Sequence, residues 1–185
     1  MPRAGLDREA VIEAAARLAD DEGLHAVTLA RLATELGIRP PSLYVHVGGL
    51  PDLRRRLGAR GARALAGELR AAAAGRADGD ALAAIAHAYR DYALRHPGSY
   101  EALQLPSGDE GEQADASAEV VDAVLAVLRG YSLQGDDAIH AVRIVRSSLH
   151  GFVTLERAGG FQIPLALDET FDRLVAMLDR GLRTG

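Results

Sequence analysis

The chain of 185 residues contains no cysteine, and none of its 21 basic residues is a lysine. The absence of cysteine excludes disulfides, thiolate metal sites and a cysteine nucleophile. The absence of lysine excludes the lysine of a P-loop, a Schiff-base lysine and the nucleophile motif Ser-x-x-Lys. The chain also has no run of 18 apolar residues and no signal peptide, so we expect a cytoplasmic protein with no membrane partner.

Sequence motifs of common enzymes are missing as well. The chain has no Gly-x-Ser-x-Gly, no His-Glu-x-x-His and no dinucleotide-binding glycine motif. A ferritin-like metal site needs two Glu-x-x-His pairs on different helices, whereas this chain has one, from Glu22 to His25, interrupted by Gly23. The sequence therefore predicts a protein that is not an enzyme, with no catalytic residues, no metal site and no cofactor.

Positive charge is concentrated near the N-terminus. Residues 23–63 contain 7 arginines and 2 acidic residues, whereas residues 64–185 contain 11 arginines and 18 acidic residues. A basic segment in a protein with a net charge of −5 indicates a local nucleic-acid surface. On charge alone, chance clustering on a solvated face remains an open alternative.

Apolar residues recur at intervals of three and four, which is typical of an all-α protein. Asp7 and Thr28 are suited to cap the first two helices, and Gly23 and Gly37 to end them. About nine helices are expected in all. The later ones begin at about Pro40, run from Pro51 to about Ala74 and from Asp80 to His96, and cover Ser99–Gln104, about Ala118–Leu128 after a loop from Pro106, Asp136–Arg157 and Leu167–Arg183.

The stretch "TLARLATELGIRPPSLYVHV" holds two of these helices separated by Gly37. A helix, a tight turn with glycine and a second helix form a helix-turn-helix unit. Leu43 and Val47 are expected to anchor the second helix. Its exposed side chains, Arg39, Ser42, Tyr44 and His46, would then reach the bases and phosphates of a major groove.

The longer segment "TLARLATELGIRPPSLYVHVGGLPDL" resembles the DNA-binding segment of the TetR family of transcriptional regulators. The matching residues are Thr28, Leu32, Ala33, Leu36, Gly37, Ser42, Leu43, Tyr44, His46 and Leu53. The sequence "LHGFVTLE" around His150 is similar to a Trp-His-Gly motif in the C-terminal domain of one branch of the family. That match is partial, because Arg146 or a neighbour stands where the aromatic residue is expected.

The resemblance implies a homodimeric repressor that binds a palindromic double-stranded DNA operator and is released by a small molecule. It implies a DNA-binding domain over residues 1–50 and a helical ligand-binding and dimerisation domain over residues 51–185. Thr28 is placed for a phosphate at the positive end of its helix. By resemblance, phosphates are expected at Tyr44 and His46, and base edges at Arg39, Pro40 and Ser42, with Pro41 and Val45 beside them.

Two positions depart from the family pattern. A lysine that often contacts phosphate is Leu50 here, and Arg54 or Arg55 is a candidate to replace its charge. The position before the two prolines is often a capping serine or threonine and is Arg39 here. This weakens the cap but adds a long donor that can pair with guanine.

The last two expected helices carry broad apolar stripes that must be buried. We expect a two-fold interface between copies through Asp136–Arg157 and Leu167–Arg183, although packing inside the monomer is the alternative. The stripe residues are Ile139, Val142, Val145, Leu149, Val153, Phe171, Leu174, Val175, Leu178 and Leu182.

An effector site is expected among the helices after Asp80, where an anionic or strongly polar molecule would suit two guanidinium groups and an imidazole. Its candidate residues are His87, Tyr100, Arg143, Arg146, Ser147 and His150. The alternative is that these arginines pair with acidic residues or point to solvent. The alternative function for the whole chain is an all-helical dimeric adaptor without sequence-specific DNA binding.

Overall fold

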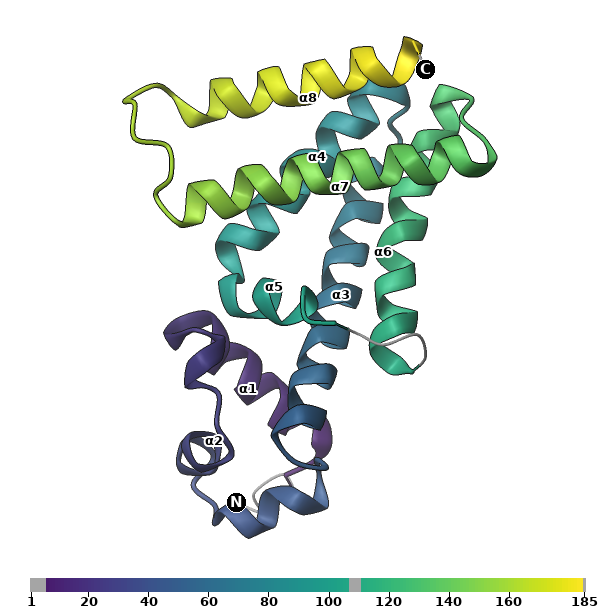
Figure 1. Ribbon diagram of the computed structural model, residues 1–185. Helices are drawn as coiled ribbons and strands as arrows, with labels where there is room; N and C mark the ends of the chain where they lie inside the picture. Colours follow the sequence, from purple (N-terminus) through teal and green to yellow (C-terminus); the bar gives the residue numbers. More distant parts are fainter. Residues whose placement is uncertain (1–5, 107–110, 185) are drawn as a thin grey trace. The chain divides into compact units, whose positions relative to one another are not determined.

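The computed structural model describes residues 6–106 and 111–184, and it contains only helices within them (Figure 1). This confirms the all-α fold class. The elements are α1 (Arg8–Glu22), η1 (Leu24–Ala26), α2 (Leu29–Leu36), η2 (Pro40–Val45), α3 (Leu50–Ala73), α4 (Asp78–Arg95), α5 (Pro97–Leu103), α6 (Glu112–Leu128), η3 (Arg129–Tyr131), α7 (Gly135–Arg157) and α8 (Leu167–Thr184), where η denotes a 3-10 helix.

The chain divides into two compact units, and the division falls within the long helices α3, α4 and α6. Unit 1 contains the described residues up to Ala64 together with those of Arg95–Ala118. Unit 2 contains Leu65–Leu94 and the described residues from Glu119 onward. None of the described helices is long and apolar enough to cross a membrane. The functional boundary expected after residue 50 stays a prediction.

Local signals fix the ends of the first two helices in unit 1. The Asp7 side chain accepts a hydrogen bond from the Ala10 amide at 2.8 Å, and Thr28 Oγ1 accepts one from the Arg31 amide at 3.1 Å. Gly37 ends α2 in the left-handed region, with φ 65° and ψ 32°. A residue with a side chain adopts this conformation at a cost, which is why glycine is preferred there. All three assignments made from the sequence are confirmed.

One expected helix type and two expected helix starts were wrong. The helix expected from Pro40 is a 3-10 helix, in keeping with its short length, its two N-terminal prolines without an N–H, and Arg39, whose side chain makes no capping hydrogen bond. Helix α6 begins at Glu112 rather than Ala118, because acidic residues in its first turn favour a helix N-terminus. Helix α5 begins at Pro97, before the expected Ser99. Residues 107–110 of the expected loop lie outside the described residues.

In unit 1, α5 packs closely against α1. A Cβ added at Gly98 would overlap the backbone carbonyl of Ala19. The Asp20 carboxylate accepts hydrogen bonds from the Ser99 amide at 2.7 Å and the Ser99 hydroxyl at 3.2 Å, and it lies 3.1 Å from His96 Nδ1. Helix α1 therefore supplies the cap that the short helix α5 lacks in its own sequence.

In unit 2, a buried arginine ties α4 to α7 and α8. Arg90 makes two hydrogen bonds to Glu156, at 2.8 and 2.5 Å, and one to Asp168 at 2.8 Å. Its guanidinium carbon lies 5.6 Å from the ring centre of Phe152 and 5.0 Å from that of Phe171. The carboxylates and the ring faces together compensate for the hydration that the Arg90 guanidinium loses on burial.

The apolar stripes expected on the last two helices are largely buried inside unit 2. Phe171, Val175, Leu178 and Leu182 of α8 are buried, as are Val142, Val145, Leu149 and Val153 of α7. Two residues of the stripes are not buried: Leu174 is half-buried, and Ile139 is 40% exposed. For most of the stripe residues, packing inside the monomer is therefore the correct interpretation, and a dimer interface has to use other side chains.

Candidate nucleic-acid interface

Two buried side chains anchor η2, the second element of the helix-turn-helix, in the core of unit 1. Leu43 is fully buried and Val47 nearly so, and both belong to the core of unit 1 with Leu32 and Ala33 of α2. Gly37 turns the chain three residues before η2 begins, and Leu43 and Val47 anchor the end of η2 in the core. The expected anchors are confirmed.

The side chains expected at DNA gather on the outside of this element. Arg39, Pro40, Pro41 and Ser42 are exposed, and His46 is half-buried. Tyr44 is 62% exposed and Val45 80% exposed, although both are large and hydrophobic. The structure therefore brings seven of the eight expected DNA-binding residues together on one short element, and that they bind DNA stays a prediction.

A contact that holds the end of η2 was not predicted from the sequence. Arg8 Nε donates a hydrogen bond to the His46 carbonyl at 3.1 Å, across 38 residues of sequence. The His46 amide in turn donates to the Leu43 carbonyl at 2.9 Å. These bonds fix the backbone at His46 and leave its imidazole partly accessible. No local pattern links Arg8 to His46, so only the fold reveals the pair.

Thr28, the eighth residue, lies exposed at the N-terminus of α2. Its oxygen already accepts the Arg31 amide, so its hydroxyl hydrogen is the atom that it can offer to a phosphate. The Arg31 side chain lies between Glu22, at 2.6 Å, and Glu35, at 3.3 Å. The hydrogen bond to Glu22 and its charge raise the pKa of Arg31.

Most of the excess positive charge of residues 23–63 is paired within unit 1. Arg56 and Arg63 both contact Glu112, at 3.1 and 2.8 Å, and Arg60 pairs with Glu13. Arg39 is different, because its exposed guanidinium has no ion-pair or hydrogen-bond partner among the described residues. Exposed pairs such as Arg63 with Glu112 thus fit the alternative of a solvated face, and the role of Arg39 at a base stays a prediction.

The start of α3 lacks the family's lysine. Leu50 packs against the core of unit 1 instead of reaching outward. Arg55 is exposed and lies 3.3 Å from Asp52, whereas Arg54 is half-buried and its Nε makes no hydrogen bond within the described chain. Of the two candidates for the missing charge, Arg55 is therefore the accessible one.

Asp52 closes the turn between η2 and α3. It accepts a hydrogen bond from the Gly48 amide at 2.9 Å and another from Arg56 at 2.9 Å. Burial alone would raise the pKa of Asp52, but the Gly48 amide and the Arg56 and Arg55 charges together lower it. The carboxylate thus remains charged and holds the turn that follows the exposed element.

Two family models match the chain in these regions. The model described as "Bacterial regulatory proteins, tetR family" matches residues 11–48, and the one described as "Tetracyclin repressor-like, C-terminal domain" matches residues 82–178. The chain belongs to the TetR family of transcriptional regulators. As a TetR-family protein it is a DNA-binding regulator and not an enzyme, as the sequence predicted.

Relatives of this TetR-family chain match it over most of its length. The uncharacterised HTH-type transcriptional regulator Rv0681 of Mycobacterium tuberculosis is 40% identical over 181 residues, which cover 97% of this chain and 83% of that protein. The uncharacterised HTH-type transcriptional regulator YobS of Bacillus subtilis is 39% identical over 163 residues, which cover 87% of this chain and 84% of that protein.

Solved structures share the fold. A structure of BioQ with its natural double-stranded DNA operator matches with a TM-score of 0.68 and 25% identity, over 97% of this chain and 99% of that one. A protein from Rhodococcus sp. RHA1 matches with a TM-score of 0.82 over 99% of each chain. At 22% identity, the second match shows the fold alone.

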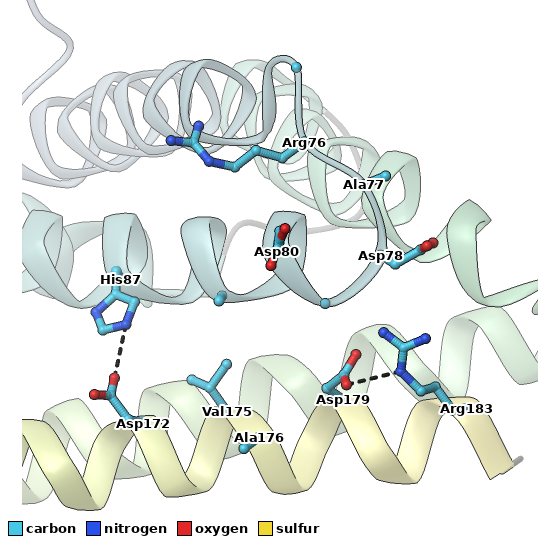
Figure 2. Close-up of a pocket in the computed structure, with 13 residues that line it drawn as sticks. Arg76, Ala77, Asp78, Asp80, His87, Asp172, Val175, Ala176, Asp179 and Arg183 are labelled. Atoms are coloured by element: carbon cyan, nitrogen blue, oxygen red, sulfur yellow. Dashed lines mark hydrogen bonds and ion pairs between the residues drawn. The ribbon is translucent and has the colours of Figure 1, made fainter.

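Unit 2 of this TetR-family protein contains a groove of about 760 Å³ between the first half of α4 and α8 (Figure 2). His87 lines it and lies 3.1 Å from Asp172, with its ring edge-on to Phe171. Farther along α8, Asp179 accepts hydrogen bonds from Arg183 at 2.9 Å and from Tyr131 at 2.6 Å. These two bonds lower the pKa of Asp179, whereas burial and the carboxylate raise that of Tyr131.

The other expected effector residues do not line this groove. Arg143, Arg146 and Ser147 lie exposed along α7, and His150 is half-buried on the same helix. Tyr100 is buried in α5, which belongs to unit 1. Of the six candidates, the structure therefore groups four along α7 and places His87 in the groove of unit 2. Their role in binding an effector stays a prediction.

Proposed function

We propose that this regulator is a homodimeric repressor that binds a palindromic operator through η2 and is released from it by a small molecule. The observation that carries the proposal is Arg39, exposed and without a partner among the described residues, at the start of an element anchored by Leu43 and Val47. The likeness to BioQ with its operator supports DNA binding by the same fold.

Operator binding can be tested by two substitutions with different expected signatures. Duplexes enriched from a randomised pool by the wild-type protein give the operator. Tyr44→Ala should weaken binding to all duplexes alike, because one sequence-independent phosphate contact is lost, and it should leave the slope of log K against log salt unchanged, because the tyrosine hydroxyl carries no charge. Arg39→Ala should instead relax preference at one base pair, with a loss of about 1–3 kcal/mol of discrimination.

The contrast between the two variants decides the outcome. Tyr44→Phe keeps the ring and removes only the hydroxyl that would donate to phosphate, so it should weaken binding to all duplexes as Tyr44→Ala does. If both Arg39→Ala and Tyr44→Ala change affinity uniformly, Arg39 does not read a base. If the wild-type protein retains DNA only at low salt and without sequence preference, the adaptor function is the better account.

Dimerisation requires apolar side chains that unit 2 leaves exposed. Ile144 and Leu155 of α7 are 53% and 50% exposed, and Met177 of α8 is 57% exposed. Ile144 and Leu155 fall on the side of α7 opposite its buried stripe, together with Gly151, above which there is open space. In a two-fold (isologous) interface through α7 and α8, these side chains of both copies would be buried, because the same surface of each copy takes part.

A test of the dimer should leave the core of the monomer intact. Ile144→Glu combined with Met177→Glu should convert the dimer to monomers at micromolar concentration, measured by light scattering with mass determination. Ala71→Glu, at an exposed position of α3, is the matched control and should leave the mass unchanged. A wild-type protein that is already a monomer would disprove the proposal.

Release by an effector is the remaining part of the proposal. A ligand shifts the protein away from DNA only if it binds the DNA-incompetent conformation more tightly. A thermal-shift screen can identify such a ligand, and the screen is then repeated on His87→Ala, Arg146→Ala and His150→Ala. Loss of the response in His87→Ala assigns the effector to the groove of unit 2, and loss in the other two assigns it to α7. An unchanged response in all three would show that the candidate residues are wrong.

A further inference from the structure

The geometry of η2 sorts its side chains into lines. A 3-10 helix has three residues per turn, so side chains three positions apart lie above one another. Leu43 faces inward, in agreement with its burial, whereas Pro40 three positions before it is exposed and His46 three positions after it is half-buried. Pro41 with Tyr44 and Ser42 with Val45 then form two outward lines. Three of these four outward residues present carbon rather than hydrogen-bonding groups over most of their surface.

This exposed apolar surface is unusual within unit 1. Tyr44 and Val45 are the only large hydrophobic side chains among the described residues of unit 1 that are mostly exposed. The other large hydrophobic residues of the helix-turn-helix, such as Leu32 and Val47, are buried. A valine that is 80% exposed on an anchored element contributes nothing to the core, so its apolar surface is available to a partner.

The polar groups on the same surface are few. Pro40 and Pro41 have no amide hydrogen, so the start of η2 offers no backbone donors at these positions. The side-chain donors on this surface are the hydroxyls of Ser42 and Tyr44 and the guanidinium of Arg39, and all three residues are exposed. In a major groove, the one apolar group that distinguishes a base pair is the C5-methyl of thymine.

We propose that Val45, with Pro41 beside it, contacts C5-methyl groups of thymines in the operator. The surface of η2 then selects A·T pairs through methyl contact, while Arg39 supplies the hydrogen bonds to a neighbouring pair. This inference rests on the proposed function, because it names the bases that the same site recognises. The positive charge of residues 23–63 and the partnerless Arg39 favour DNA over an apolar protein as the occupant of this surface.

Replacing thymine by uracil tests the contact, because it removes the methyl group and leaves every hydrogen-bonding atom in place. In the operator obtained by selection, each thymine is replaced by uracil in turn. At the contacted positions, wild-type affinity should fall about fourfold, the factor that corresponds to ~0.8 kcal/mol for one buried methyl-sized group. Elsewhere in the operator, the replacement should leave affinity unchanged.

Substitution of Val45 completes a double-mutant cycle. Val45→Ala should bind the thymine operator about as weakly as the wild type binds the uracil operator, and it should no longer distinguish the two. Thr34→Ala, at an exposed position of α2 outside the expected DNA-binding residues, is the control and should keep the full preference for thymine. Because Val45 is mostly exposed, Val45→Ala should fold normally, which circular dichroism confirms, and Val45→Thr offers a second variant of similar shape.

The outcomes separate this inference from the function on which it rests. If an operator is selected but uracil is tolerated at every position, or if Val45→Ala keeps the full preference for thymine, the inference is overturned and the proposed function stands. If no duplex is enriched at all, the proposed function fails, and the inference fails with it.

Discussion

The interiors of the two units are stabilised by different kinds of side chain. Unit 1 is packed with small residues, and a buried run of alanines in α1 lets Gly98 of α5 approach the backbone of Ala19. Unit 2 is organised around the buried Arg90, its carboxylate partners and the rings of Phe152 and Phe171. The contact between α1 and α5 in unit 1 therefore has no room for added volume, whereas unit 2 depends on charges that remain compensated.

This difference suits the two roles proposed here. Close packing of small residues holds the backbone below η2 in one position, which reading a base sequence requires. A buried ion pair is strongly dependent on geometry, so an interior built on one can change its stability when a partner moves or a proton binds. The three predictions below probe this contrast, from the largest expected effect to the smallest.

The largest effect is expected from removing the charge at the centre of unit 2. Arg90→Met keeps an aliphatic side chain of similar length but leaves the carboxylate of Glu156 buried without its partner. Breaking a buried pair in this way costs about 3–5 kcal/mol of unfolding free energy. Urea denaturation followed by circular dichroism measures the loss.

A matched control distinguishes the buried carboxylate from the exposed one. The Asp168 side chain is 87% exposed, whereas that of Glu156 is 12% exposed. Asp168→Asn should therefore cost less than about 1 kcal/mol, as is usual for an exposed ion pair. If it costs as much as Arg90→Met, the stability of unit 2 does not depend on the buried pair as argued here.

An intermediate effect is expected from adding one methyl group to unit 1. Gly98→Ala places a Cβ where the Ala19 carbonyl already lies, so α5 must move away from α1. Overpacking of this kind costs about 1–3 kcal/mol of unfolding free energy. Thermal denaturation of the variant and the wild type, compared under identical conditions, measures this.

The opposite sign is expected at a glycine with free space around it. Gly67 is exposed in the middle of α3, and a Cβ added there meets no other atom within 4 Å. Gly67→Ala should stabilise the protein by about 0.5–1 kcal/mol, because alanine loses less conformational entropy in a helix. Equal effects of the two substitutions would show that the α1–α5 contact is not tight.

These contacts also show what the sequence could predict. The caps at Asp7 and Thr28 and the stop at Gly37 follow from residues within three or four positions, so all were correctly predicted. The prolines at the start of η2 were recognised, yet a 3-10 helix was mistaken for an α-helix because proline in a first turn is compatible with both.

Long-range pairs leave no such local signal. Asp20 and Ser99 are 79 residues apart, and Arg90 and Glu156 are 66 apart. The apolar stripe of α8 was recognisable from its period, but its period could not identify the partner that covers it. The family resemblance was enough to select the residues of η2 as candidates for DNA binding. Whether their side chains have ion-pair or hydrogen-bond partners depends on the folded chain, as the partnerless guanidinium of Arg39 shows.

The smallest effect is expected from protonation of His150 on α7. Burial lowers the pKa of His150, and the positive charges of Arg146 and Arg157 lower it further. The unfolded chain therefore binds this proton at a higher pH than the native chain does. The resulting stability is complete above the unfolded pKa of about 6.5 and is lost as the pH falls from there through the native pKa.

Acidification should thus destabilise the wild type more than a variant without this imidazole. Between about pH 7.5 and 5.5, the unfolding free energy of His150→Gln should fall less than that of the wild type. Arg146→Gln removes one of the two charges that disfavour the imidazolium, so its pH dependence should lie between the other two. Urea titrations of all three proteins across this range give the comparison. Parallel curves for the wild type and His150→Gln would contradict the argument.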